Sequence, residues 1–309
     1  MTRLINRFIR NTIFSITILC VSGYFLKEKR PELFHKWSEV VIGAFHKEFA
    51  HYNSTADDFN FAQNKTEATV YTAPNSDGFI PWGTPRGNRL NLLKSDAFIS
   101  AFDSARGLPA WVAYRLSPPR YNQAYQRPDD DPFYADTDAA VVVHPDDYKY
   151  SGYDRGHMAP AYAISTRYGS DAVLETFKMS NIVPQLPNLN RRSWKNAELY
   201  LAKKFSSRQE ATYIVCGPIF DSSRTFLNQS SLGRKIEIPD AFFMMAIGIT
   251  GNTYETFSIV LPQTVDSTAD YRDYAVSIDY IESKTGIDFY HELPDIEEDP
   301  MERKIPQIN

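Results

Sequence analysis

The chain has 309 residues, of which 43% are hydrophobic and 23% charged. This globular composition excludes a wholly disordered chain, a collagen-like chain and a polytopic membrane protein. The 33 Lys and Arg against 38 Asp and Glu give a net charge of −5, which alone does not indicate polyanion binding. The chain has two cysteines, Cys20 and Cys216, which excludes a disulfide scaffold or a Cys-rich zinc module.

Residues 1–30 are predicted to be a signal peptide or an N-terminal membrane anchor. Three arginines precede an apolar run of 14 residues from Ile13 to Leu26. As a helix this run spans about 21 Å, which is short for a hydrocarbon core of roughly 30 Å. Charged residues follow at once and no small-residue cleavage site is evident, so a cleaved signal, an uncleaved anchor and a buried soluble helix all stay open. The targeting interpretations favour an extracytoplasmic protein, secreted, periplasmic or membrane-anchored. In a eukaryote the acid-free, Arg-rich start also fits a mitochondrial import signal.

Residues 31–75 are predicted to form an amphipathic helix and a linker. Apolar side chains recur at helical spacing between Leu33 and Phe49, whereas residues 51–75 are polar and rich in turn formers. The helix could dock on the main domain or lie along a membrane surface. Docking is favoured because its polar face is not strongly basic.

Residues 76–295 are predicted to form one α+β domain. The segments 110–116, 212–216 and 254–261 are rich in β-branched and aromatic residues, which favours strands. Residues 268–285 are expected to form a helix that ends at Gly286. The apolar run 242–249 fits a strand or a buried helix equally well. Residues 296–309 are expected to be an acidic, loose surface tail.

A basic segment lies in the middle of this acidic chain. Residues 154–208 hold nine Lys and Arg against four acids, a local charge of +5 that leaves −10 for the remainder. Such a segment could steer a phosphate polymer to one place on the surface. The alternative is an ordinary solvated helix face, which would account for Lys195, Lys203 and Lys204.

The sharpest cluster in this segment is Asp154-Arg155-Gly156-His157. A neutral imidazole is the usual general base near pH 7, and a neighbouring guanidinium can bind a phosphate in fork geometry. Asp154 could fix the tautomer of a histidine or pair with an arginine. The alternative is a structural histidine, which most single histidines are.

A second cluster follows about 30 residues later. Asn190 stands at or just before the start of a predicted helix on which Glu198 shares a face with apolar residues. The two are separated by about 12 Å of helical rise, which suits contact through a metal-bound water better than shared direct ligation. An amide oxygen is a suitable ligand for Mg²⁺. The alternatives are an ordinary N-cap for Asn190 and a salt bridge to an arginine for Glu198.

Taken together, the ordered motifs resemble those of the endonuclease G-like DNA/RNA non-specific endonucleases of the ββα-metal, or His-Me finger, superfamily. The resemblance covers roughly residues 80–295. It rests on DRGHMAP at 154–160, SNIVPQ at 180–185, Asn190, Trp194 and Glu198. It implies an α+β fold with a central antiparallel-rich sheet flanked by helices, and an active site on a β-hairpin and helix.

The resemblance also implies roles for individual residues. His157 matches the general base, Asn190 the sole direct protein ligand of Mg²⁺ (with Mn²⁺ as a substitute), and Glu198 the carboxylate that holds metal-bound water. Phosphate contacts are expected from Arg155 and Arg191 and from one upstream arginine, Arg127 or Arg120, with supporting roles for Asp154 and Asn181. Where members often carry a further arginine, one turn after the glutamate, this chain has Ala202.

The predicted function is therefore Mg²⁺-dependent hydrolysis of phosphodiester bonds in both DNA and RNA, giving 5′-phosphate products. The alternative is an extracytoplasmic nucleic-acid-binding protein with an impaired nuclease site, and a third class is a membrane-tethered structural module. DNA and RNA are the expected partners, and the N-terminal segment leaves membrane association open. Homodimers are common in the family, and no protein partner is inferred.

Overall fold

The computed structural model describes residues 78–308 except for 88–89, 121–129, 222–223, 228–234 and 252. The predicted leader at 1–30, the predicted helix and linker at 31–75, and Arg127 therefore lie outside the described residues. Within the described part of the chain, no helix is long and apolar enough to span a bilayer.

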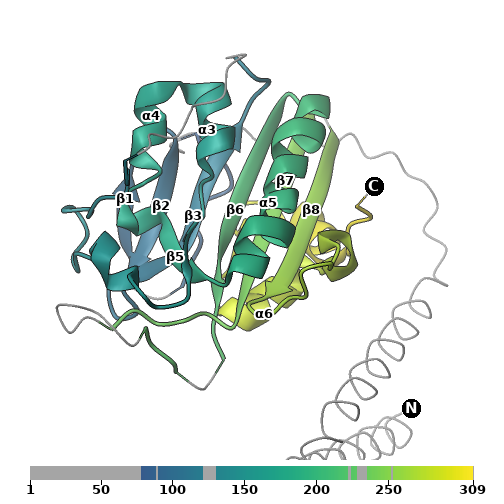
Figure 1. The fold of residues 1–309 in the computed structure, drawn as a ribbon. Helices are drawn as coiled ribbons and strands as arrows, with labels where there is room; N and C mark the ends of the chain where they lie inside the picture. Colours follow the sequence, from purple (N-terminus) through teal and green to yellow (C-terminus); the bar gives the residue numbers. More distant parts are fainter. Residues whose placement is uncertain are drawn as a thin grey trace, which may run out of the picture. The chain divides into compact units, whose positions relative to one another are not determined.

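A six-stranded antiparallel sheet forms the centre of the domain (Figure 1). The three segments expected to be strands are strands, and the unassigned apolar run lies in β7. The sheet order is β1-β2-β3-β6-β7-β8. The bounds are β1 Asn91–Lys94, β2 Phe98–Asp103, β3 Leu108–Leu116, β6 Ala211–Ile219, β7 Ala241–Thr250 and β8 Thr253–Pro262.

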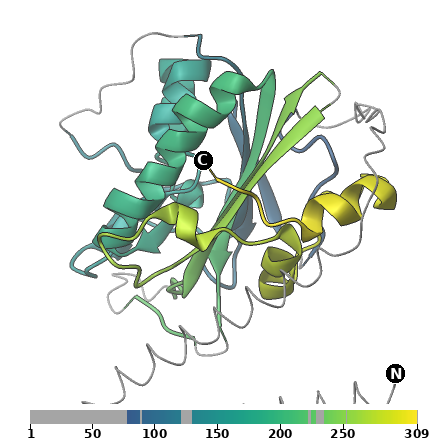
Figure 2. The same cartoon turned by 90° about the vertical axis from the view of Figure 1, so that its right-hand side faces the viewer.

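Both faces of the sheet are covered by helices, as Figure 2 shows. Along β7, Phe242, Met244 and Ala246 belong to one hydrophobic core and Phe243 and Met245 to the other. A strand that is buried on both faces does not alternate between polar and apolar residues. For this reason the hydrophobic pattern of residues 242–249 could not distinguish a strand from a buried helix. The helices α3 Ala161–Tyr168 and α4 Ser170–Glu175 cover the first face, and α6 Ile278–Thr285 and α7 Asp295–Arg303 cover the second.

The long connection between β3 and β6 carries the hairpin and helix that the sequence motifs predicted. Strands β4 Asp154–His157 and β5 Ile182–Gln185 pair antiparallel. A continuous helical segment follows, with wide π-type turns (η3 Leu189–Trp194 and η4 Leu201–Phe205) on either side of α5 Lys195–Tyr200. Wide turns of this kind often occur near functional sites. Short 3₁₀ turns complete the domain: η1 Pro145–Tyr148, η2 Met179–Asn181, η5 Ser206–Arg208 and η6 Tyr271–Tyr274.

Two expectations for the C-terminal part need correction. The helix expected over 268–285 begins at Ile278, because the Ser277 side chain accepts the Tyr280 N–H and caps it there. Its end at Gly286 is as expected, with φ of 67°. The tail expected to be loose from 296 instead forms most of α7, whose Met301 is buried in the second core. Acidic side chains in the first turn stabilise the N-terminus of such a helix. The same acidic composition suggested a loose tail, so the helix was not predicted.

Candidate active site on the hairpin and helix

The hairpin depends on a close approach of two strands at Gly156. Gly156 pairs with Val183, and the side chain of buried Gln185 lies over its Cα, where an added Cβ would stand 2.1 Å from Gln185 Oε1. Only glycine leaves this space. Because side chains alternate along a strand, Arg155 and His157 share one face of β4.

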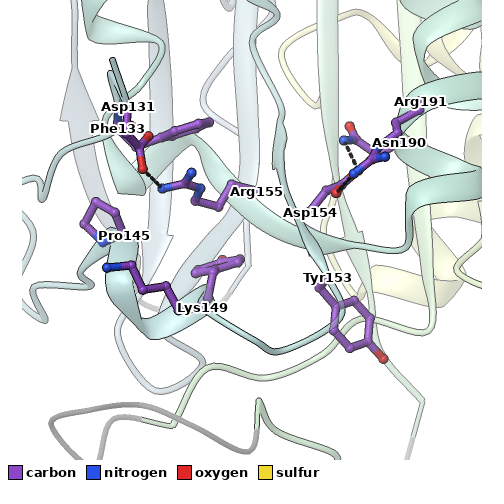
Figure 3. A pocket seen from close by; sticks show the side chains of 10 residues that line it. Asp131, Phe133, Pro145, Lys149, Tyr153, Asp154, Arg155, Asn190 and Arg191 are labelled. Carbon is purple, nitrogen blue, oxygen red and sulfur yellow. Dashed lines mark hydrogen bonds and ion pairs between the residues drawn. The ribbon is translucent and has the colours of Figure 1, made fainter. Parts of the chain in front are cut away.

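Asp154 joins the hairpin to the start of the helix. Its Oδ2 accepts a 2.9 Å hydrogen bond from Asn190 Nδ2, and Arg191 donates to both carboxylate oxygens at 2.7 and 2.6 Å (Figure 3). Partial burial acts to raise the pKa of Asp154, but the hydrogen bonds from Arg191 and Asn190 outweigh it and the pKa is lowered. Asp154 was expected either to fix the tautomer of a histidine or to pair with an arginine, and it pairs with Arg191.

Asn190 is not the N-cap that the alternative interpretation proposed, because it lies within the helical segment and its own N–H donates to the Leu186 carbonyl at 2.9 Å. Its amide nitrogen donates to Asp154, and no donor among the described residues binds its Oδ1. The carboxamide is thus oriented with its oxygen available to a cation.

The loop after His157 is held by Asn181. This fully buried side chain accepts the Ala159 N–H at 2.8 Å and donates to the carbonyl oxygens of Ala159 and Thr176. The ring of His157 packs against Phe177 and Phe133, with ring centroids 5.1 and 5.4 Å away. These contacts fix the imidazole on the hairpin.

Arg155 lies beside two residues that the motifs did not indicate. Its Nη1 is 2.8 Å from Asp131 Oδ2, and its guanidinium carbon lies 4.1 Å from the centroid of the Phe133 ring. Both partners precede the hairpin by more than 20 residues, so no local pattern could have identified them. Together they hold the guanidinium at the mouth of a cavity.

That cavity, of about 420 Å³, brings the two predicted clusters together. Asp154, Arg155, Asn190 and Arg191 all line it, whereas His157 and Glu198 do not. The remaining lining residues are Asp131, Phe133, Pro145, Tyr148, Lys149 and Tyr153, most of which Figure 3 labels.

Glu198 lies on the inward side of the helix, as expected, and is partly buried. Its pKa is raised to about 8 by burial, with the Trp194 indole and Lys195 acting in the opposite direction. The salt bridge proposed as an alternative is absent, since no basic residue of the described segments lies within ion-pair distance of it. Among the described residues the carboxylate therefore has no ion-pair partner.

The basic segment does not form one continuous basic surface. Arg167 is buried and structural: it donates to the carbonyl oxygens of Ser117 and Ala202 and to Ser206 Oγ. Lys195, Lys203 and Lys204 lie exposed along the helix, as the solvated-face alternative proposed. Ala202 itself is buried, so its position faces the core and not the cavity.

Of the two upstream arginines, only Arg120 is described. Its side chain is exposed and its backbone N–H bonds to the Thr166 carbonyl. Arg127 lies outside the described residues, so the choice between them stays a prediction.

Comparison with known proteins identifies similar chains. A family model described as DNA/RNA non-specific endonuclease matches residues 75–296. A nuclease of Nostoc sp. is 30% identical over 74% of this chain and 85% of its own. Human mitochondrial endonuclease G is 28% identical over 65% of this chain and 70% of its own. The solved EndoG/EndoGI complex shares the fold, with a TM-score of 0.60 and 22% identity over 72% of this chain and 95% of that one.

Proposed function

The chain belongs to the DNA/RNA non-specific endonuclease family, and from this we propose that it hydrolyses phosphodiester bonds at the hairpin site with a divalent metal ion and with His157 as general base. The chain is a hydrolase acting on nucleic acids, and the family is metal-dependent. We propose the identity of the metal ion, the role of His157 as general base, and the 5′-phosphate ends of the products.

One observation carries this proposal: the start of the helix is tied to the hairpin through Asn190 and Asp154. The bond joins residues 36 positions apart and brings the amide on the helix to the strand that bears Arg155 and His157. A base, a phosphate-binding guanidinium and a neutral oxygen ligand on one small scaffold suit hydrolysis of a phosphodiester.

The residues present fit a hard divalent ion. Counting only the residues that the structure describes, Asn190 offers an oriented amide oxygen without a bound donor, and Glu198 offers a carboxylate without an ion-pair partner. Asn190 would hold the ion directly and Glu198 through water, with Mg²⁺ as the expected metal and Mn²⁺ as a substitute. When bound, the ion would neutralise negative charge that develops on the phosphate.

The protein side chains would divide the remaining work. His157 would accept a proton from the water that attacks phosphorus. Arg155 would bind a phosphate oxygen, and Arg191, exposed beside it on the cavity wall, would bind a second one. Because water is the nucleophile, no 2′-hydroxyl is needed, so both DNA and RNA would be cleaved to 5′-phosphate products. Contacts to phosphates alone would give weak sequence preference and strong salt dependence.

Ala202 stands where many family members have an arginine. This difference would affect the catalytic rate, but it does not remove the proposed site. Because Ala202 faces the core, a phosphate contact from this position would require the helix to rotate. Lys203, the next residue, is exposed and lies over the Tyr162 ring at 5.0 Å. The proposed site therefore uses one arginine fewer than is common in the family.

The cellular compartment of the enzyme can be inferred from its relatives and its N-terminal segment. Several similar proteins are named as mitochondrial nucleases, in human and in Saccharomyces cerevisiae, whereas the Nostoc relative is named only as a nuclease. We propose that residues 1–30 direct the domain out of the compartment where it is made, to a mitochondrion in a eukaryote or beyond the cytoplasm in a bacterium. Sequencing the N-terminus of the mature protein would test this.

The test of the mechanism is His157→Ala, assayed on plasmid DNA and on RNA with Mg²⁺ and with EDTA. Loss of a general base should lower the rate about 100- to 10,000-fold. His144→Ala, which removes an exposed histidine outside the cavity, should leave the rate unchanged. Full activity of the His157 variant, or undiminished cleavage in EDTA, would remove this mechanism. Binding without cleavage over a Mg²⁺ and Mn²⁺ series would favour a binding protein with an impaired site.

A further inference from the structure

Three carboxylates meet between α6 and α7, on the face of the sheet opposite the hairpin (Figure 2). They belong to Asp279 and Glu282 on α6 and to Glu302 on α7, and one oxygen of each lies within 4.8 Å of the others. Two oxygens that each stand about 2.4 Å from a shared calcium ion are at most about 5 Å apart. The spacing therefore permits one ion to contact all three side chains.

The inner end of this cluster holds buried polar atoms without partners. Glu302 is 7% exposed, and its Oε1 has no hydrogen-bond partner among the described residues. The hydroxyl of Tyr290, a residue 6% exposed, also lacks one. Burial, with the charges of Glu302 and Glu282, raises the pKa of that hydroxyl. Buried polar atoms are rarely left unsatisfied, which points to a missing ligand.

The basic residue nearest in sequence acts on the exposed end of the cluster, where the charge of Arg303 partly offsets the burial that raises the pKa of Asp279. Arg303 follows Glu302 directly, but its guanidinium binds Asp299 at 2.6 Å on the preceding turn of α7. Glu282 Oε1 accepts the Phe289 N–H at 2.7 Å, which orients this carboxylate. At the outer end Asp279 is exposed, so water and ions can reach the cluster.

We propose that Asp279, Glu282 and Glu302 bind a calcium ion that joins α7 to α6. Calcium accepts six to eight oxygen ligands in irregular geometry, whereas Mg²⁺ demands a near-regular octahedron. The three carboxylates, with water from the exposed side, would supply such a set. The ion would be structural, and its binding does not depend on the proposed nuclease mechanism.

The test uses full-length protein with Asn190→Ala, so that the proposed nuclease metal does not contribute. After EDTA treatment and dialysis, calcium at a hundredfold excess over its Kd should raise the Tm by about 5 °C. Adding Glu302→Gln should abolish this rise. This change keeps the shape of the side chain and removes a repulsive charge, so the variant should fold at least as well without calcium. Asp295→Asn, which alters an exposed acid on the same helix, should keep the full calcium response.

Terbium, which occupies calcium sites, provides a direct measure of binding. Tyr290, whose hydroxyl is affected by the charges of Glu302 and Glu282, contacts Trp82 edge to face with centroids 5.7 Å apart, so both rings can sensitise bound terbium. Emission should appear in the Asn190→Ala protein, fall when calcium is added and be lost with Glu302→Gln. A Tm unaffected by calcium, or terbium emission that persists in the Glu302 variant, would overturn the proposal. Neither readout depends on nuclease activity.

Discussion

The amide nitrogen of Asn190 donates a 2.9 Å hydrogen bond to Asp154 Oδ2, and this bond decides which atom of Asn190 is presented to a ligand. With its nitrogen held by the carboxylate, the amide offers its oxygen. Asp154 is itself held by Arg191 through two hydrogen bonds. A residue that touches no metal in the proposed mechanism thus orients the residue that does.

Replacing Asp154 should therefore weaken metal binding before it affects the chemical step. Loss of a residue that orients a ligand typically lowers metal affinity about 10- to 100-fold. For Asp154→Ala we expect the Mg²⁺ concentration that gives half-maximal cleavage to rise by that factor, with much of the rate recovered at high Mg²⁺. Arg191→Ala keeps the Asn190 bond and should shift the midpoint far less. An unchanged midpoint in the Asp154 variant would contradict this role.

Gly156→Ala should destabilise the hairpin. The new Cβ would overlap the buried Gln185 side chain, and overpacking of this kind costs about 1–3 kcal/mol. Urea unfolding would measure the loss. The double variant Gly156→Ala with Gln185→Ala should recover part of it, because the overlapping atoms are gone. If the single variant were as stable as the parent, the close approach of the strands would not require glycine.

Arg155→Lys should lower kcat/KM for nucleic acids while leaving the fold intact. A lysine keeps the charge but cannot bind phosphate as a fork, and a lost charge-assisted hydrogen bond corresponds to about 10- to 150-fold. Asp131→Asn is the matched change on the other side of the ion pair. It removes a negative charge from the cavity and should lower KM, with little effect on stability because the pair is partly exposed. Equal kcat/KM for the lysine variant and the parent would argue against a phosphate contact.

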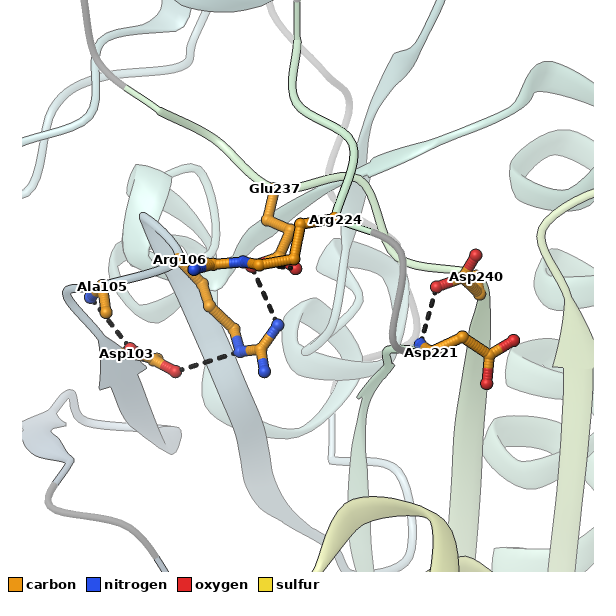
Figure 4. Close-up of polar contacts among 7 residues, drawn as sticks. All are labelled: Asp103, Ala105, Arg106, Asp221, Arg224, Glu237 and Asp240. Carbon is orange, nitrogen blue, oxygen red and sulfur yellow. Dashed lines mark hydrogen bonds and ion pairs between the residues drawn. The ribbon is translucent and has the colours of Figure 1, made fainter.

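Glu237→Gln should destabilise the fold more than loss of its exposed arginine partner. This buried carboxylate lies 2.8 Å from both Arg106 and Arg224 and joins the loop before β7 to the turn after β2 (Figure 4). Both arginines are partly exposed, so the change leaves no buried charge, and the weakened charge-assisted hydrogen bonds cost about 1.5–3 kcal/mol. Arg224→Ala removes an exposed partner and leaves the Arg106 pair, so it should cost about 1 kcal/mol or less. Chemical denaturation of the two variants would show the difference, and equal losses would mean that the buried carboxylate is not the critical partner.

The sequence predicted elements well where a local pattern reflects the final environment. The β-branched segments became β3, β6 and β8, and Gly286 ends α6 with the left-handed backbone expected of a helix stop. Prediction failed where the environment comes from distant elements. The run in β7 could not be assigned because helices cover both its faces, and α7 was missed because its acidic composition concealed Met301, which packs into the second core.

The same distinction applies to the site. Helical periodicity placed Glu198 on the inward face of its helix, because this follows from backbone geometry over a few residues, whereas the shared face of Arg155 and His157 became evident only once β4 was known. Only the tertiary structure showed that Asp154 binds Asn190, that Asp131 and Phe133 hold Arg155, and that Glu302 lies buried beside Asp279. These contacts join residues 22 to 36 positions apart, and such pairings depend on how the strands and helices pack, which no short stretch of sequence encodes.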